Sequence, residues 1–176
     1  MVSNMTIRKI SFFWAVGIIA ILTLSAFSQD QTFSDPNVDY SFILPDAKWK
    51  MTAKPSATSP NVEYVYGDRR DGHLEVRRIA VPKNAILTDV IRDEEQKQQF
   101  RPGYVAGKEE NFVGSFRGSV FNFEYVTAAN NMAGRFYFLR VNPTTVYLLR
   151  FTGQKDILRS VRNQTDSIAR TFSVKQ

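Results

Sequence analysis

The sequence feature that most constrains the fold is an alternation of aromatic residues between Phe112 and Phe151. These forty positions hold ten of the 23 aromatic residues in the chain. Phe121, Phe123 and Tyr125 occupy every second position and have polar residues between them. A period of two places alternate side chains on opposite faces of a strand. The pattern therefore predicts a strand with one dry face and one wet face.

Two further strands are predicted over residues 135–141 and 146–151, where the alternation repeats. The connections at 128–134 and 142–144 contain asparagine, glycine and proline, and they are too short for crossover helices. We therefore expect the three strands to form an antiparallel meander.

The segment that follows is the expected cover of this sheet, because a few strands with an apolar face are not stable alone. Residues 154–170 place apolar or small side chains at helical spacing: Ile157, Leu158, Val161, Thr165, Ile168 and Ala169. We expect this helix to pack on the sheet through Val161 and Ile168, with Arg162 facing water.

The N-terminal segment is typical of an exported protein. Arg8 and Lys9 precede an apolar run over residues 10–27, and small residues follow it. This pattern predicts a signal peptide over residues 1–28, cleaved between Ser28 and Gln29. The alternative is an uncleaved membrane anchor formed by residues 10–27, which just reach the length needed to span. Either interpretation places the domain outside the cytoplasm, in the periplasm or secreted.

Cleavage would leave 148 residues (176 minus 28), enough for a single domain with its own core. Its net charge would be +4, from 21 basic and 17 acidic residues. The basic residues are spread along the chain, so we expect no nucleic-acid partner, although a mild attraction to an anionic envelope surface is compatible with this charge. The absence of cysteine excludes a disulfide scaffold, a thiol nucleophile and a lipid-modified N-terminal cysteine.

The domain itself is expected over residues 38–174, after a flexible polar leader at 29–37. Residues 38–44 are predicted to form its first strand, and Trp49 to anchor in the core. A loop rich in proline and hydroxyl residues follows at 54–61. Membrane contact is expected only through the N-terminal segment, and only if that segment is retained.

A hairpin is predicted from residues 62–66 and 74–81, with a turn that contains Asp71 and Gly72. The apolar alternation changes phase at Arg77 and Arg78, which predicts a bulge there.

A helix is then predicted from a cap at Asn84 to Gln99, with its polar second half, residues 92–99, in water. Residues 104–112 are predicted to form another strand.

We find no recognised pattern for catalysis, a metal or a cofactor. His73 is the only histidine, and the serine hydrolase motif G-x-S-x-G is absent. Asp68 and Asp71 share a glycine-containing turn but lack the remaining ligands of a calcium loop. The acidic pairs Glu94-Glu95 and Glu109-Glu110 are adjacent in sequence, so their side chains diverge and are expected in solvent. The sequence therefore predicts a non-enzyme with no catalytic residue, metal or cofactor.

The densest polar group lies on the predicted hairpin and its turn. It comprises Arg69, Arg70, His73 and Arg77. These residues either form a solvated turn or bind a partner, and we take them as the candidate patch for an unknown protein or envelope component. The alternative function is a carrier of an apolar small ligand held between sheet and helix, with the loop at 54–61 as its gate.

Four stretches, read together, resemble the PsbP-like superfamily. They are residues 40–45 with Trp49, and residues 116–125, 146–151 and 164–172. The chain is most similar to exported bacterial members of unknown function. The resemblance implies an α+β fold, an α/β/α sandwich with an antiparallel sheet of about six or seven strands and helices packed on its faces. It also implies action by binding, and its matching positions are core and turn residues, so no functional residue is carried over.

Overall fold

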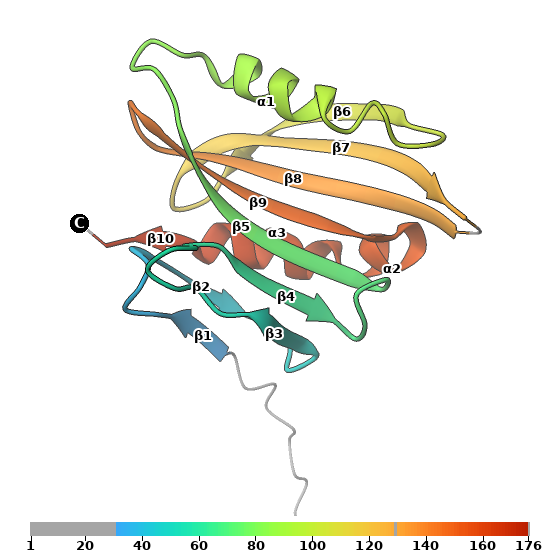
Figure 1. Cartoon of the computed structure of the whole chain (residues 1–176), viewed down its shortest axis with the longest axis horizontal. Helices are drawn as coiled ribbons and strands as arrows, with labels where there is room; N and C mark the ends of the chain where they lie inside the picture. Colours follow the sequence, from blue (N-terminus) through green and yellow to red (C-terminus); the bar gives the residue numbers. More distant parts are fainter. Residues whose placement is uncertain (1–30, 129, 176) are drawn as a thin grey trace, which may run out of the picture.

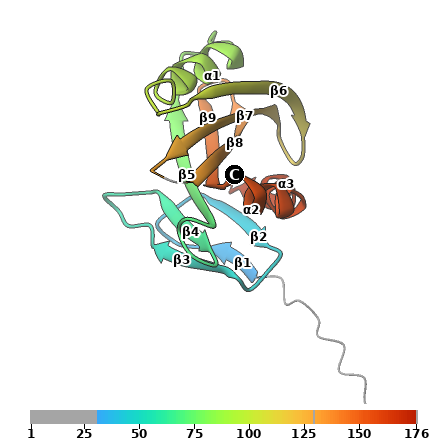
Figure 2. The ribbon, with the colours of Figure 1, turned by 90° about the vertical axis from the view of Figure 1, so that its right-hand side faces the viewer.

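The structure is a computed structural model that describes residues 31–128 and 130–175. It has three layers, which Figures 1 and 2 show from two sides. Helix α1 (Leu87–Gln96) covers one face of a central sheet. Helices α2 (Lys155–Ser160) and α3 (Arg162–Thr171) cover the other face, together with a small second sheet.

The central sheet has seven antiparallel strands in the order β3-β4-β5-β9-β8-β7-β6. In that order they are β3 (Trp49–Ala53), β4 (Val62–Tyr66), β5 (Gly72–Ala80), β9 (Thr145–Gln154), β8 (Asn130–Asn142), β7 (Arg117–Thr127) and β6 (Val105–Val113). The small sheet has the order β1-β2-β10, with β1 (Gln31–Ser34), β2 (Tyr40–Leu44) and β10 (Ser173–Val174). The α+β class and the predicted meander β7-β8-β9 are thus confirmed.

The prediction of one wet face is confirmed for β7, where Asn122 and Glu124 are partly exposed, but it is wrong for the central strands β8 and β9, which are buried on both faces. Tyr147 and Leu149 of β9 pack toward α2 and α3, whereas Val146 and Leu148 pack toward α1. Large apolar side chains at odd and even positions of β9 require a cover on each side, because exposing either set would cost apolar burial. Phe121, with Phe123 and Tyr125, lies on the α1 side.

The predicted bulge at Arg77 and Arg78 is wrong. Strand β5 pairs with β9 in unbroken register from His73 to Ala80. The apolar phase changes because Leu74 packs in the core beneath α3, whereas Ile79 packs against the core beneath α1. A strand buried on both faces needs no bulge to carry apolar side chains in both phases.

Helix α1 differs from its prediction at both ends. It begins after Ile86, and no side chain caps it, so the prediction of Asn84 as the cap is wrong. Its polar second half is exposed at most positions, as predicted, but Glu94 and Gln98 are buried. Glu94 is covered because α1 lies flat on the sheet, and its carboxylate pairs with Lys97 of the next turn.

The last helical segment packs on the sheet as predicted, through Val161 and Ile168, while the Arg162 side chain is 53% exposed. The segment is divided at Val161 into α2 and α3, whereas one helix was predicted.

Order begins before residue 38. Strand β1 pairs with β2, and the ring of Phe33 is buried at 4.8 Å from the ring of Phe42. The prediction of a flexible leader over 29–37 is therefore wrong for residues 31–34, because an apolar side chain in this polar stretch docks in the core.

The predicted signal peptide or anchor, with its cleavage position between Ser28 and Gln29, lies outside the described residues. Within the described part of the chain, no helix combines the length and the apolar character that crossing a membrane requires.

Candidate functional site

The predicted hairpin is formed by β4 and β5, and its turn directs charged side chains to one end of the molecule. Gly67 adopts a positive φ of 68°, which a residue without Cβ tolerates. The Asp68 carboxylate then accepts hydrogen bonds from the backbone N–H groups of Arg70, at 2.7 Å, and Asp71, at 3.1 Å. These bonds hold the turn and leave the side chains of Arg69 and Arg70 exposed.

On β5 itself, His73, Glu75 and Arg77 alternate and so share one face of the sheet. There they adjoin a cleft of about 330 Å³ on the α1 side of the sheet. We call it the arginine cleft, and it is lined by Arg69, His73, Glu75, Arg101, Tyr125, Met132, Arg150 and Thr152. The cleft thus joins the hairpin, the turn after α1 and strands β7 to β9.

Arg101 is held in the cleft by two buried partners. Its Nε donates a hydrogen bond of 2.8 Å to the amide oxygen of Gln98, which is buried. Its guanidinium lies over the ring of Tyr125, at 4.4 Å from the ring centroid. This stacking leaves the other guanidinium N–H groups free of a carboxylate partner among the described residues. Arg101 is therefore pre-oriented for an anion.

Arg150 forms the floor of the cleft. One terminal nitrogen lies 3.1 Å from the Glu75 carboxylate, and the guanidinium stacks on Phe136 at 5.0 Å. Its Nε is buried and has no hydrogen-bond partner in the described residues. Burial lowers the pKa of the Arg150 guanidinium, and the positive charge of Arg77 lowers it further. The negative charges of Glu75 and Glu94 act in the opposite direction but do not outweigh burial.

The carboxylates near the cleft are shared between cations. Glu75 pairs with Arg77 at 2.5 Å as well as with Arg150. Glu63 lies 2.9 Å from His73 and 3.7 Å from Arg69. Four arginines thus face two carboxylates, which leaves a net positive site.

The structure brings together only part of the predicted patch. Arg69 and His73 line the cleft, whereas Arg77 adjoins it through Glu75, and Arg70 pairs with Asp68 at 3.8 Å outside it. Arg101 and Arg150 also line the cleft but were not predicted, because they are remote from the hairpin along the chain. Arg150 could have been identified only from the register of β5 against β9, which places it opposite Glu75.

A second cleft, of about 440 Å³, lies on the other face of the sheet between α2 and strands β6 to β8. We call it the α2 cleft. Its lining includes the small residues Gly107, Ala133 and Gly134 and four basic side chains from the sheet and both helices: Arg135, Lys155, Arg159 and Arg162. Three carboxylates lie close to these four cations, so the excess of positive charge is smaller than in the arginine cleft.

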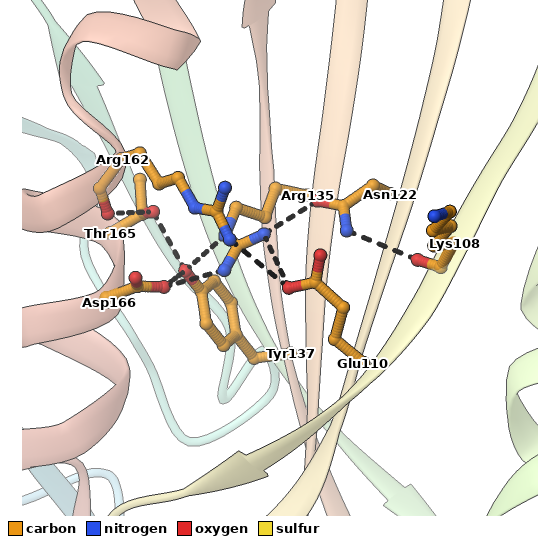
Figure 3. A network of polar contacts seen from close by, with 8 residues as sticks. All are labelled: Lys108, Glu110, Asn122, Arg135, Tyr137, Arg162, Thr165 and Asp166. Carbon is orange, nitrogen blue, oxygen red and sulfur yellow. Dashed lines mark hydrogen bonds and ion pairs between the residues drawn. The ribbon is translucent and has the colours of Figure 1, made fainter.

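Arg135, which lines the α2 cleft, is buried in a network of polar contacts (Figure 3). Its guanidinium donates hydrogen bonds to Tyr137 at 2.7 Å, Asn122 at 2.8 Å and Asp166 at 2.8 Å. Tyr137 also donates to Asp166, while its oxygen lies 2.8 Å from the hydroxyl of Thr165. Every member has a partner, so this network holds α3 to the sheet rather than presenting a free charge.

Asp166 stays ionised within this network. Burial raises the pKa of its carboxyl, but hydrogen bonds from Tyr137 and Arg135 outweigh burial, and the pKa falls below the usual 3.8.

Other candidate groups take part in local contacts. Glu94 is buried and pairs with Lys97, and Glu95 accepts a hydrogen bond from the Tyr104 hydroxyl at 3.0 Å, so the prediction that this acidic pair is solvated is wrong for Glu94. Glu110 pairs with Arg162 at 3.2 Å. Within residues 31–128 and 130–175, no group of three metal-ligating side chains is close enough to hold a metal ion.

No family model matches the chain, and no curated protein matches it in sequence. The solved structures that are similar in fold include the following three. The cyanobacterial PsbP of Synechocystis is 16% identical with a TM-score of 0.60, covering 90% of this chain and 99% of its own. The Ran-binding protein Mog1p of Saccharomyces cerevisiae is 9% identical with a TM-score of 0.60, covering 84% and 96%. LpqN of Mycobacterium tuberculosis, involved in cell envelope biogenesis, is 13% identical with a TM-score of 0.54, covering 84% and 92%. The chain therefore has a PsbP-like fold, as its sequence motifs predicted.

Proposed function

We propose that this PsbP-like domain is an exported, non-catalytic binding protein that recognises an anionic group of a protein or envelope component through the arginine cleft. The observation that carries the proposal is the convergence of Arg69, Arg101 and Arg150 on one cleft lined by a single carboxylate, Glu75. Arginine side chains bind carboxylates and phosphates through several parallel hydrogen bonds, which gives both energy and orientation.

The cleft is suited to binding because its cations are already positioned. Arg101 is held by Gln98 and Tyr125, and Arg150 by Glu75 and Phe136. A ligand would therefore lose little side-chain entropy on binding, and pre-organisation of this kind raises affinity. Arg69 lies on the turn and can close over the ligand, because its contact with Glu63 is long and exposed.

Export is proposed from the sequence, in which Arg8 and Lys9 precede an apolar segment. An envelope role is compatible with the similarity in fold to LpqN, and protein binding with the similarity to Mog1p. A non-catalytic role is proposed because His73, the only histidine, adjoins Glu63 rather than a hydroxyl nucleophile.

Binding is tested by capture from an envelope extract with the immobilised chain from Gln29. The double variant Arg69→Gln/Arg101→Gln removes two cleft cations, and Arg117→Gln removes an exposed arginine at the start of β7 as the matched control. We expect the cleft variant to lose its captured component and the control to retain it, with recovery that falls as salt is raised. Equal capture by the wild type and the cleft variant would contradict the proposal.

A second candidate function is the carriage of a small ligand between sheet and helix. The α2 cleft supports it, since its volume of about 440 Å³ is within the range of small-molecule sites and its lining includes small residues. The loop at 54–61 does not line this cleft and so would not gate it. Mass spectrometry of gently purified protein tests this function: a bound lipid or metabolite that is lost in Ala133→Leu supports it, and protein without any ligand argues against it.

A further inference from the structure

We infer that the anionic partner of the arginine cleft is a phospholipid surface, and that Phe100 inserts into this surface beside the cleft. The inference rests on the proposed function, adds to it the identity of the partner, and departs from the expectation that only the N-terminal segment contacts a membrane. It starts from an exposed apolar side chain that neither the core nor the cleft uses.

Phe100 lies in the turn between α1 and β6, and its side chain is 91% exposed. It precedes Arg101, whose guanidinium is in the cleft. The turn is not loose, because Arg101 donates its backbone N–H to Gln98, and Val126 donates its own to Pro102 at 2.8 Å. Phe100 is therefore presented by an anchored turn, and keeping an aromatic ring in water has an unfavourable free energy that insertion would remove.

The turn of Phe100 and the turn of the hairpin lie at the same end of the molecule. In Figure 1 both are at the right-hand end, where β4 ends and β6 begins. The cleft confirms their proximity, since it is lined by Arg69 of one turn and Arg101 of the other. Arg70 is exposed on the hairpin turn beside Arg69. In the proposed orientation this end faces the bilayer, with Phe100 and these arginines on the side that meets it.

An aromatic ring at the tip of a turn, with basic side chains around it, fits the boundary of an anionic bilayer. Aromatic residues are favoured at the level of the lipid headgroups, and arginine pairs with lipid phosphates. A folded protein partner would instead require a continuous apolar area to exclude water from its contact. Phe100, with only the exposed Val105 and Val126 near its turn, does not form such an area, so the bilayer is the partner that these residues favour.

Binding is measured by co-sedimentation with vesicles of phosphatidylglycerol and phosphatidylcholine, and with vesicles of phosphatidylcholine alone. The chain from Gln29 is used, so that the N-terminal segment does not itself bring the protein to the bilayer. This chain contains both hydrophobic cores, whose residues lie between Phe33 and Val174. Soluble glycerol phosphate is titrated in parallel as a probe of the cleft without a bilayer.

The variant Phe100→Ser removes the inserting ring, and Val113→Ser is its matched control. Val113 is 70% exposed at the opposite end of β6, so both variants replace an exposed apolar residue without touching the cores. We expect binding to the anionic vesicles to fall about tenfold in Phe100→Ser and to be unchanged in Val113→Ser. The double variant Arg69→Gln/Arg101→Gln should also lose binding, whereas Arg117→Gln should not.

Insertion has a direct readout in Phe100→Trp. The chain from Gln29 lacks Trp14, and its own tryptophan, Trp49, is buried. A blue shift of the tryptophan emission on adding anionic vesicles would therefore report the residue introduced at position 100.

The outcomes separate the two proposals. Binding of glycerol phosphate without vesicle binding would overturn the lipid inference and support the anion site. Equal binding to neutral vesicles, or equal loss in Phe100→Ser and Val113→Ser, would also overturn it. Failure to bind glycerol phosphate, anionic vesicles and the envelope extract would overturn both.

Discussion

Arg135 is buried beneath α3, and its guanidinium donates hydrogen bonds to Tyr137, Asn122 and Asp166. A guanidinium removed from water is tolerated only when its charge and its N–H groups are matched, as they are by Asp166 and Asn122. The sequence indicated a helix with Arg162 outward, but nothing in its spacing identified Asp166 as the partner of an arginine in β8.

Asp166→Asn should lower the free energy of unfolding at pH 7 by about 3 kcal/mol, because Arg135 would remain buried without its counter-charge. The pKa of Asp166 is lowered in the folded state, so its stabilising effect is present above the unfolded value near 3.8 and is lost as pH falls through the folded pKa. Urea unfolding at pH 7 and pH 3 should therefore show a difference between wild type and variant that shrinks with acid. Asp93→Asn, at an exposed position, is the control, and a difference independent of pH would contradict this role.

Gly134→Ala should destabilise the domain, since a Cβ at Gly134 would lie 2.2 Å from the ring of Phe123. Phe123 is buried and cannot move away, so we expect a loss of about 2 kcal/mol in urea unfolding. Adding Phe123→Leu should make the loss from Gly134→Ala smaller than in the wild-type background. An unchanged loss in that background would show that the ring is not the obstacle.

The elements follow from the sequence wherever a single periodicity decides them. The meander was predictable because alternation at Phe121 and Phe123 requires a strand. The burial of β9 on both faces was not predictable, because α1, which covers one of them, lies about sixty residues earlier in the chain. The division between α2 and α3 was not predictable either. Val161, where the two helices meet, continues the apolar spacing on which the prediction of one helix rested.

The contrast between Val161→Asp and Arg162→Asp tests the packing of this segment. Val161 is buried, so an aspartate there should reduce stability by about 4 kcal/mol, enough to unfold a marginal domain. Arg162 is exposed and forms a surface pair with Glu110, so its replacement should cost less than about 1 kcal/mol. Thermal melting measures both, and equal melting temperatures would contradict the packing.

In the candidate site too, the residues that are close in sequence were predictable and those that are distant in sequence were not. Arg69 and His73 were predictable as a group because they are neighbours on one turn. Arg101 and Arg150 join them only through the pairing of β5 with β9 and the position of the turn after α1. Sequence spacing carries no information on either.

The whole molecule has two cores on either side of one sheet, and its first described strand belongs to the larger of them. Phe33 contacts the rings of Tyr40, Phe42 and Tyr64. Residues 29–37 were predicted to be a flexible leader because Phe33 alone, among polar residues, gives no periodicity from which a strand could be predicted.

A chain that begins at Val38 should therefore be less stable than one that begins at Gln29. Loss of the buried Phe33 ring and of the β1 pairing is expected to cost about 4 kcal/mol, by comparison with Phe to Ala substitutions in cores. Urea unfolding compares the two chains, with Phe33→Leu in the longer chain as an intermediate case. Equal stability of the two chains would mean that β1 does not contribute to the core.

The most direct measurement of the anion site is a titration of the chain from Gln29 with glycerol phosphate, followed through the arginine Nε–Hε resonances. We predict saturable shifts at Arg69, Arg101 and Arg150 and no shift at Arg117, because only the first three line the arginine cleft. Shifts of equal size at all four arginines, or none at the cleft, would contradict the central claim that these side chains form one anion-binding site.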